Sequence, residues 1–261
     1  TSRQAAWYPA DAVHSRIWIT ALGDFFLLLA RAAAAAFLSP PRRSAVLAQL
    51  HEVGVRSLSI VNLTAVFTGM VMALQLGYFL AQFGAKIFVG RIVGLAIITE
   101  LGPVLTALMV GGRVGAGMAA ELGTMKVTEQ VDALRALGVD PIGHLVVPRL
   151  LAVMVMLPLL TALADLIGVL GAAVIAYVEL GVQPAFYFRS LLQYLTMGDL
   201  LRSLTKAFFF AIIIGGIACR NGLAASGGAD GVGRATTRTV VMASITVLVS
   251  DFFLTKLMLA L

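Results

Sequence analysis

Residues 100–149 read ELGPVLTALMVGGRVGAGMAAELGTMKVTEQVDALRALGVDPIGHLVVPR, and this stretch interrupts a chain that is otherwise largely apolar. After residue 100 it balances four basic against four acidic side chains: Arg113, Lys126, Arg135 and Arg149, and Glu121, Glu129, Asp132 and Asp140. Helix-forming residues prevail in it, and Gly138 followed by Asp140 and Pro141 is a typical helix stop. We therefore predict a helix over 120–138 that lies outside the bilayer.

Two charge pairs are expected on this helix, because residues three apart lie on neighbouring turns. They are Lys126 with Glu129, and Asp132 with Arg135. Together with Glu121, these side chains form the surface that we predict to contact a partner protein.

The composition determines the class of protein before any motif is considered. Of 261 residues, 60% are hydrophobic and 12% are charged, and the mean hydropathy is +0.97. Such a chain has lipid as its main solvent, so it is an integral membrane protein with one membrane domain over 1–261. No long polar block is left for a nucleotide-binding domain of its own. Any energy source must be a partner or a gradient.

Several ligand classes are excluded by the same sequence. The net charge of +6 is scattered between apolar segments, which is typical of membrane topology signals and not of nucleic-acid binding. The glycine-rich run at 228–235 has Arg234 and Ala235 where a phosphate loop needs Lys and Ser or Thr. His14 and His51 lack metal-ligand spacing, and Cys219 is the single cysteine. We expect no metal site, no internal disulfide and no bound cofactor.

The apolar segments predict five membrane spans. Between Arg56 and Lys86 lie 29 residues without a formal charge, more than the roughly 20 needed to cross the hydrocarbon core. The predicted transmembrane helices are 57–82, 92–112, 150–178, 203–219 and 239–261.

Residues 13–38 are apolar but carry a narrow polar stripe. Arg16, Asp24 and Arg31 fall in one quadrant of a helix. Such a helix suits the headgroup boundary better than the core, where the charges would be costly. We predict an amphipathic interfacial helix, the alternative being a sixth span.

The positive-inside rule gives the orientation. With a cytoplasmic N-terminus, thirteen Lys and Arg residues lie on the cytoplasmic side and six on the other side. The helix over 120–138 is then cytoplasmic and the C-terminus periplasmic.

The most informative residues are the ionisable ones within or beside the spans: Glu100, Asp165, Lys206 and Asp251. A charge at such depth needs a partner, a cavity or a proton. They are interpreted either as a polar cavity for substrate or gating, or as structural groups, for instance an ion pair of Lys206 with Glu100 or Asp251. Pro103 predicts a kink beside Glu100.

A lipid-carrying path also needs an apolar wall. The first span, with Met70 and Leu74, and the fifth span are predicted to form it. Small residues also recur at four-residue spacing, at Gly111, Gly115, Ala119 and Gly123, and again at Gly168 and Ala172. Such ladders predict close helix packing, within one subunit or across a dimer.

Three segments carry a family resemblance: residues 100–149, GRATTRTVV at 233–241 and DFFLTKLM at 251–258. They closely resemble the MlaE/YrbE family of ABC-transporter permeases, from about residue 50 to the C-terminus. The resemblance implies a homodimeric permease in the inner membrane of a Gram-negative cell, which moves phospholipid between the inner and outer membranes. It also implies that the 120–138 helix docks into an ATPase.

The partners implied by the resemblance are two cytoplasmic ATPase subunits, which would hold ATP and magnesium, an accessory cytoplasmic subunit and a periplasmic hexamer of MCE domains. A stand-alone proton-coupled carrier that uses Glu100, Asp165 and Asp251 as a relay is the alternative. A scaffold that only anchors a complex is a third class, but it would not need charges at membrane depth.

Overall fold

The computed structural model describes residues 10–38 and 41–260, with side chains described for 23–38 and 41–260. Within these ranges every regular element is helical. Five helices there are long and apolar enough to cross a membrane: Arg43–Gln82, Lys86–Val127, Ile142–Val178, Met197–Leu223 and Gly228–Ala260. The predicted class, an all-α integral membrane protein, is confirmed.

Several of the long helices change their hydrogen-bond pattern along their length. Two short π-helical turns, η3 and η4, lie within the second spanning helix, and a third, η5, begins the third spanning helix. The elements in chain order are α1 (Ala10–Leu38), α2 (Arg43–Val53), η1 (Val55–Ser57), α3 (Leu58–Gln82), η2 (Lys86–Phe88), α4 (Val89–Ala96), η3 (Ile97–Leu101), α5 (Gly102–Val110), η4 (Gly111–Gly115), α6 (Ala116–Val127), α7 (Gln130–Ala136), η5 (Ile142–Val146), α8 (Val147–Val178), α9 (Pro184–Leu192), α10 (Met197–Leu223) and α11 (Gly228–Ala260).

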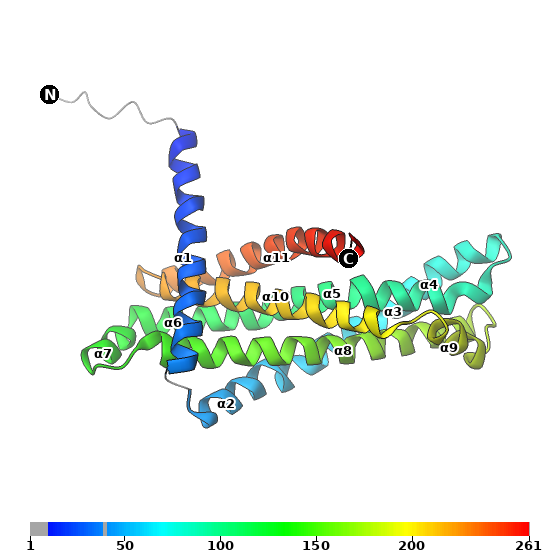
Figure 1. Cartoon of the computed structure of the whole chain (residues 1–261), viewed down its shortest axis with the longest axis horizontal. Helices are drawn as coiled ribbons and strands as arrows, with labels where there is room; N and C mark the ends of the chain where they lie inside the picture. The colour runs from blue at the N-terminus through cyan, green and yellow to red at the C-terminus, as the bar shows by residue number, and fades with distance from the viewer. Residues whose placement is uncertain (1–9, 39–40, 261) are drawn as a thin grey trace.

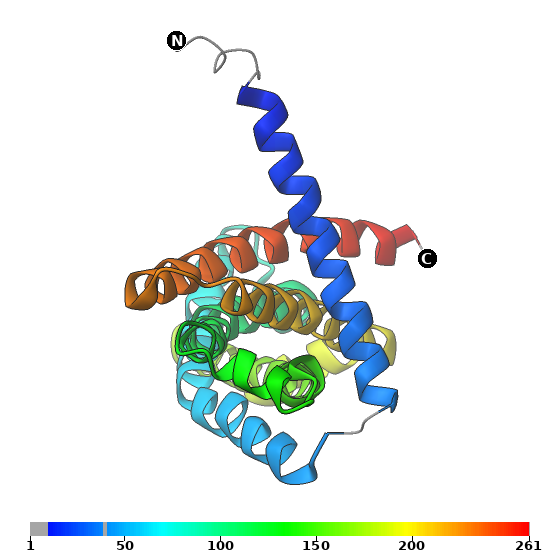
Figure 2. The same ribbon diagram turned by 90° about the vertical axis from the view of Figure 1, so that its left-hand side faces the viewer.

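The long helices lie side by side along one axis, as Figure 1 shows. The short helix α7 lies at one end of this bundle, and α4 and α9 lie at the other end. Helix α1 crosses the bundle steeply in both views (Figures 1 and 2), and it contacts η5, α8 and α10. The bundle therefore has two distinct ends, with α1 and α7 near the same one.

The closest helix pair is α3 with α8, and its contact depends on glycine. A Cβ added at Gly69 would overlap the carbonyl oxygen of Gly168. Helices in lipid associate through such close packing, because no hydrophobic driving force acts between them. The seam fixes α3 on α8 as one unit.

The second spanning helix is longer than predicted. It runs without interruption from Lys86 to Val127, whereas the predicted span covers 92–112. At 1.5 Å per residue its 42 residues extend about 63 Å, twice a hydrocarbon core of about 30 Å. The return of charge at Arg113 does not end the helix, because the helix-forming residues of α6 continue it. The third, fourth and fifth spanning helices also extend past their predicted limits.

The single helix predicted over 120–138 is wrong. Its first part belongs to α6, and α7 is a separate helix after a break at Thr128 and Glu129, where Glu129 has φ 61°. The break brings Lys126 to Asp132 (2.7 Å) and not to Glu129. The predicted pair of Asp132 with Arg135 is present at 2.9 Å. Gly138, with φ 75°, ends the segment as predicted.

The ladder of small residues packs inside the chain. Gly111 and Gly115 lie against Ile214 of α10 and against side chains of α11, and Gly123 lies against Val232. This confirms intramolecular packing for that ladder.

The α3–α8 seam gives a first prediction. Gly69→Ala should destabilise the chain by roughly 1–3 kcal/mol, because the methyl group has no room beside the Gly168 backbone. Gly117→Ala is the matched control: a Cβ there meets no atom within 4 Å, and alanine favours a helix by about 1 kcal/mol. Thermal unfolding in detergent measures both. An unchanged melting temperature for Gly69→Ala would contradict the seam.

Candidate functional site

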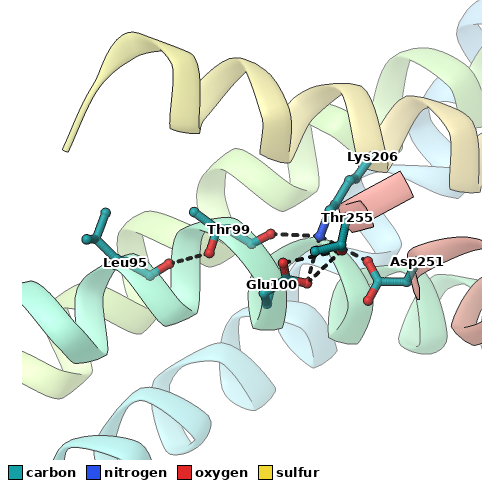
Figure 3. Close-up of polar contacts among 6 residues, drawn as sticks. All are labelled: Leu95, Thr99, Glu100, Lys206, Asp251 and Thr255. Atoms are coloured by element: carbon teal, nitrogen blue, oxygen red, sulfur yellow. Dashed lines mark hydrogen bonds and ion pairs between the residues drawn. The ribbon is translucent and has the colours of Figure 1, made fainter. Parts of the chain in front are cut away.

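The intramembrane charges meet at one point between η3, α10 and α11 (Figure 3). The Lys206 ammonium lies 2.7 Å from Glu100 Oε2 and 3.1 Å from Asp251 Oδ1. It also donates to the Thr99 carbonyl at 3.1 Å. The hydroxyl of Thr255 donates to Glu100 at 3.3 Å. We call Glu100, Lys206 and Asp251 the ion triad.

Pro103 explains why a backbone carbonyl is free to join the triad. In an α-helix the Thr99 carbonyl would accept from residue 103, but proline has no N–H. Its oxygen accepts from the Lys206 ammonium instead. The helix adjusts through the π-turn η3, which carries Glu100. The irregularity predicted beside Glu100 is thus a π-turn, a feature often found at functional sites.

Burial within the triad is unequal. The Lys206 side chain is only 2% exposed, whereas Asp251 is 20% and Glu100 41% exposed. A lysine so deeply buried requires compensating acceptors, since an isolated charge in the membrane costs about 2.5–3.5 kcal/mol even on insertion scales. Two carboxylates and one ammonium give the triad a formal charge of −1. Glu100 is the most exposed member of the triad.

The triad lies level with the middle of the first span. Gly168 approaches Ala65 and Gly69 of α3 on one side and Ile97 on the other. Ile97 is one turn from Glu100, and Gly69 lies near the centre of the uncharged stretch at 57–85. The ion triad is therefore far from both ends of the apolar segment.

Asp165 does not join the triad. It is 5% exposed, and its Oδ2 accepts from Ser203 at 2.9 Å. Its Oδ1 lies against Gly102, where a Cβ would overlap it, and no hydrogen-bond donor among the described residues reaches that oxygen. Asp165 thus links α8 to α10 one turn from Lys206.

An apolar cavity lies between α3 and the second spanning helix, and no residue of the ion triad lines it. Its volume is only about 20 Å³, and α3, the second spanning helix and Ala164 line it. Neither Met70 nor Leu74 is among the lining residues, and Leu74 is 39% exposed on the outer surface of α3. Helix α11 does not line this cavity, because η3 and α5 lie between it and α3.

The predicted partner surface is anchored by two sets of ion pairs. Glu121 accepts from the buried Arg149 at 2.8 Å, which ties α6 to the start of α8. Asp132 accepts from Lys126 and Arg135. The hydrogen bond from Lys126 lowers the pKa of Asp132, so the carboxylate is ionised at neutral pH.

The remaining side chains of this surface face outward. Glu129 is exposed at the break before α7, and Leu137 is 78% exposed after it. A single exposed leucine is common on protein surfaces, so the prediction of a contact here rests on the charged side chains.

Sequence reasoning missed the residues that support these groups. Thr255 stands four residues after Asp251 and Ser203 three before Lys206, so helix spacing could have placed both on the right faces. The polar contact of Arg113 with Ser57 joins residues 56 apart and leaves no such signal. In the described part of the chain, no three His, Cys, Asp or Glu residues gather as a metal site would require.

The unequal role of the three charges gives a second prediction. Lys206→Met leaves two carboxylates without their cation, which should cost roughly 3–5 kcal/mol and deplete the folded protein. Adding Glu100→Gln and Asp251→Asn to Lys206→Met should restore most of the stability. Membrane abundance and detergent melting temperature check this. Equal loss in the single and triple variants would show that the charges do not stabilise one another.

Comparison with known proteins places this geometry in a family. The family model described as Permease MlaE matches residues 46–257. A probable ABC transporter permease protein of Rickettsia typhi is 42% identical over 89% of this chain and 90% of its own length. A probable ABC transporter permease protein of Synechocystis is 40% identical over 83% of this chain and 82% of its own.

A further relative has a more specific name. The intermembrane phospholipid transport system permease protein MlaE of Haemophilus influenzae is 37% identical over 92% of this chain and 97% of its own length. The family-model match over 46–257 covers most of every spanning helix and the whole ion triad. The chain is a multi-pass membrane protein that belongs to the MlaE permease family of ABC transporters.

Proposed function

We propose that this chain is the permease subunit of an ATP-driven transporter that moves phospholipids between the inner and outer membranes. The observation that carries the proposal is the mid-membrane ion triad, together with a narrow apolar cavity that is lined by Ile97 and Leu101 of the same π-turn as Glu100. The name of the Haemophilus relative supports phospholipid as the substrate.

Two features of the geometry suit a lipid, one for its acyl chains and one for its headgroup. The cavity wall is apolar apart from threonine hydroxyls, as acyl chains require. The triad supplies a cation within a few ångströms of an accessible carboxylate, where a headgroup phosphate can compete with Glu100 for Lys206. A volume of about 20 Å³ holds about one water molecule, so the helices must part before a lipid enters.

Energy would come from a separate ATPase. ATP and magnesium would bind to two cytoplasmic ATPase subunits, and this chain would bind no cofactor. The contact surface is Glu121 and α7, with Lys126, Glu129, Asp132 and Arg135 around it. The continuous helix from Lys86 to Val127 connects this surface to Glu100, so a push on α7 can reach the triad.

The remaining assembly follows the same proposal. A second copy of this chain would cover the exposed apolar face of α11, which includes Ile245, Leu248 and Phe252. A periplasmic hexamer of MCE domains would bind at the end with α4 and α9, and an accessory subunit would bind with the ATPase. The protein would lie in the inner membrane, with a cytoplasmic N-terminus and a periplasmic C-terminus.

The two flanks of α1 support an interfacial position for it. One flank lines an apolar cavity of about 460 Å³ with Leu151 and Met154 of α8. The other flank places Arg31 in a pocket with Arg42 and His144. A helix with lipid on one side and charge on the other, lying across the spans, suits the cytoplasmic headgroup layer. The side chain of Arg16, which was used to predict this, lies outside the described ones.

The proton-carrier alternative lacks a relay. Asp165 bonds to Ser203, and in the described part of the chain no hydrogen bond joins it to Glu100 or Asp251. We therefore keep the ATP-driven permease as the single proposal.

Removing a carboxylate from the triad tests the substrate role. In Glu100→Ala the lysine keeps Asp251 and the Thr99 carbonyl, so the charge stays compensated and abundance should hold. Losing a charged contact of about 1.5–3 kcal/mol should slow lipid transfer roughly tenfold or more. Asp251→Ala should likewise keep its abundance and slow lipid transfer. Glu179→Ala, at the far end of α8, is the control. A parallel loss of abundance and transfer would assign the triad a structural role only.

Charge reversal at Asp132 tests the coupling surface. Asp132→Lys would remove the ion pairs with Lys126 and Arg135 and would place three positively charged side chains next to one another. ATP hydrolysis by the assembled complex should then continue while ATP-dependent lipid transfer falls. Asp230→Lys makes the same charge change at an exposed position outside the predicted coupling residues and should behave as wild type. If Asp132→Lys still binds the ATPase and transfers lipid at the wild-type rate, α7 takes no part in coupling.

A further inference from the structure

Arg113 lies where the second spanning helix passes the start of the first one. It belongs to the π-turn η4, on the face opposite to Gly111 and Gly115. Those glycines pack against α10 and α11, so Arg113 faces α2 and η1 instead. Its side chain is 34% exposed. Neither the ion triad nor the coupling surface includes it.

Its contacts all reach the junction of α2 with α3. Arg113 Nη1 donates to Ser57 Oγ at 2.7 Å, and Ser57 is fully buried. Arg113 Nη2 lies 3.8 Å from Glu52 Oε1, and Arg56 holds the other oxygen of Glu52 at 2.7 Å. Among the described residues, these are the only side-chain hydrogen bonds or ion pairs between residues 41–82 and 86–127.

Cavities lie on both sides of this contact. On the bilayer side is the narrow apolar cavity of about 20 Å³, bounded by Val61 and Met109 at its near end. On the other side is a larger cleft of about 220 Å³ between α2 and α6, lined by Gln49, Glu52, Arg113 and Glu121 among others. Arg113 therefore stands between a narrow apolar cavity and a wider cleft that holds charged side chains.

Widening the apolar cavity requires α3 to part from α5. Helix α3 cannot easily slide on α8, because Gly69 and Gly168 lock that seam. The α3–α8 unit would have to move as one body away from the second spanning helix. The polar tie that resists this motion is Arg113 with Ser57 and Glu52.

We propose that Arg113 is a positioning residue that latches the α2–α3 junction to the second spanning helix and keeps the apolar cavity narrow. The latch lies on the same continuous helix as the coupling surface and Glu100, so a displacement of α6 strains it directly. The role of the latch in lipid transport rests on the proposed function, whereas the contacts that form the latch do not depend on it.

The test measures the width of the cleft with spin labels. Cysteines replace Gln49 and Gly117, which line opposite walls of the cleft, in a Cys219→Ala background. A Cβ at Gly117 meets no atom within 4 Å, so a label fits there. The complex with its ATPase is placed in lipid nanodiscs, and the distance distribution is recorded with and without ATP.

Arg113→Gln should shift the population toward longer distances without nucleotide, by roughly tenfold for a lost charged hydrogen bond. Ser57→Ala, which keeps Glu52, should shift it in the same direction but less. Arg56→Gln is the matched control, because Arg56 binds the same Glu52 but does not reach the second spanning helix. It should leave the distances unchanged.

Two outcomes would overturn the latch. One is a wild-type distribution in Arg113→Gln with the protein folded. The other is an equal shift in Arg56→Gln. If Arg113→Gln does not fold, Ser57→Ala is measured in its place, and a wild-type distance distribution in that variant would overturn the latch. Wild-type lipid transfer is measured in parallel: its absence, with the label shifts as expected, would count against the proposed function and leave the latch standing.

Discussion

The structure depends on the burial of one ammonium group at the centre of the membrane domain. Lys206 is 2% exposed and takes its acceptors from two other helices, so α10, α11 and the second spanning helix must meet at its side chain. Pro103 has no N–H and so leaves the Thr99 carbonyl free to accept from Lys206, and the π-turn η3 carries Glu100 to the same point. A salt bridge in this setting adds little net stability, but it specifies which helices meet and at what register.

A single helix connects this centre to the proposed coupling surface at α7. From Lys86 to Val127 the backbone stays helical through two π-turns, which carry Glu100 and Arg113 at their ion pairs. Farther along, Glu121 is tied to the buried Arg149 at the start of α8. This continuous helix makes polar contacts with its neighbours at Glu100, Arg113 and Glu121, so it can transmit a displacement of α6 to the membrane centre. A helix that ended at residue 112 could not.

How much the sequence predicts depends on the range of the interaction. Uncharged stretches reveal the five spans, because burial in lipid excludes charge over some 20 residues. The pairing of Lys206 with Glu100 or Asp251 follows from the cost of unpaired charge, although a polar cavity would offset the same cost. Charge does not predict the helix limits, because it marks the membrane boundary and not the end of a helix. The break at Glu129 and the contact of Arg113 with Ser57 arise from local turn geometry and long-range packing, which periodicity does not encode.

The central claim is that lipid moves through this chain at the expense of ATP and not of a proton gradient. The most direct measurement reconstitutes the chain in liposomes, alone and with its ATPase, and follows transfer of a fluorescent phospholipid to acceptor vesicles. We predict transfer only with the ATPase and hydrolysable ATP, at a rate that does not change when an ionophore collapses the pH gradient. Transfer by the chain alone, driven by an imposed pH gradient and insensitive to ATP, would contradict the account.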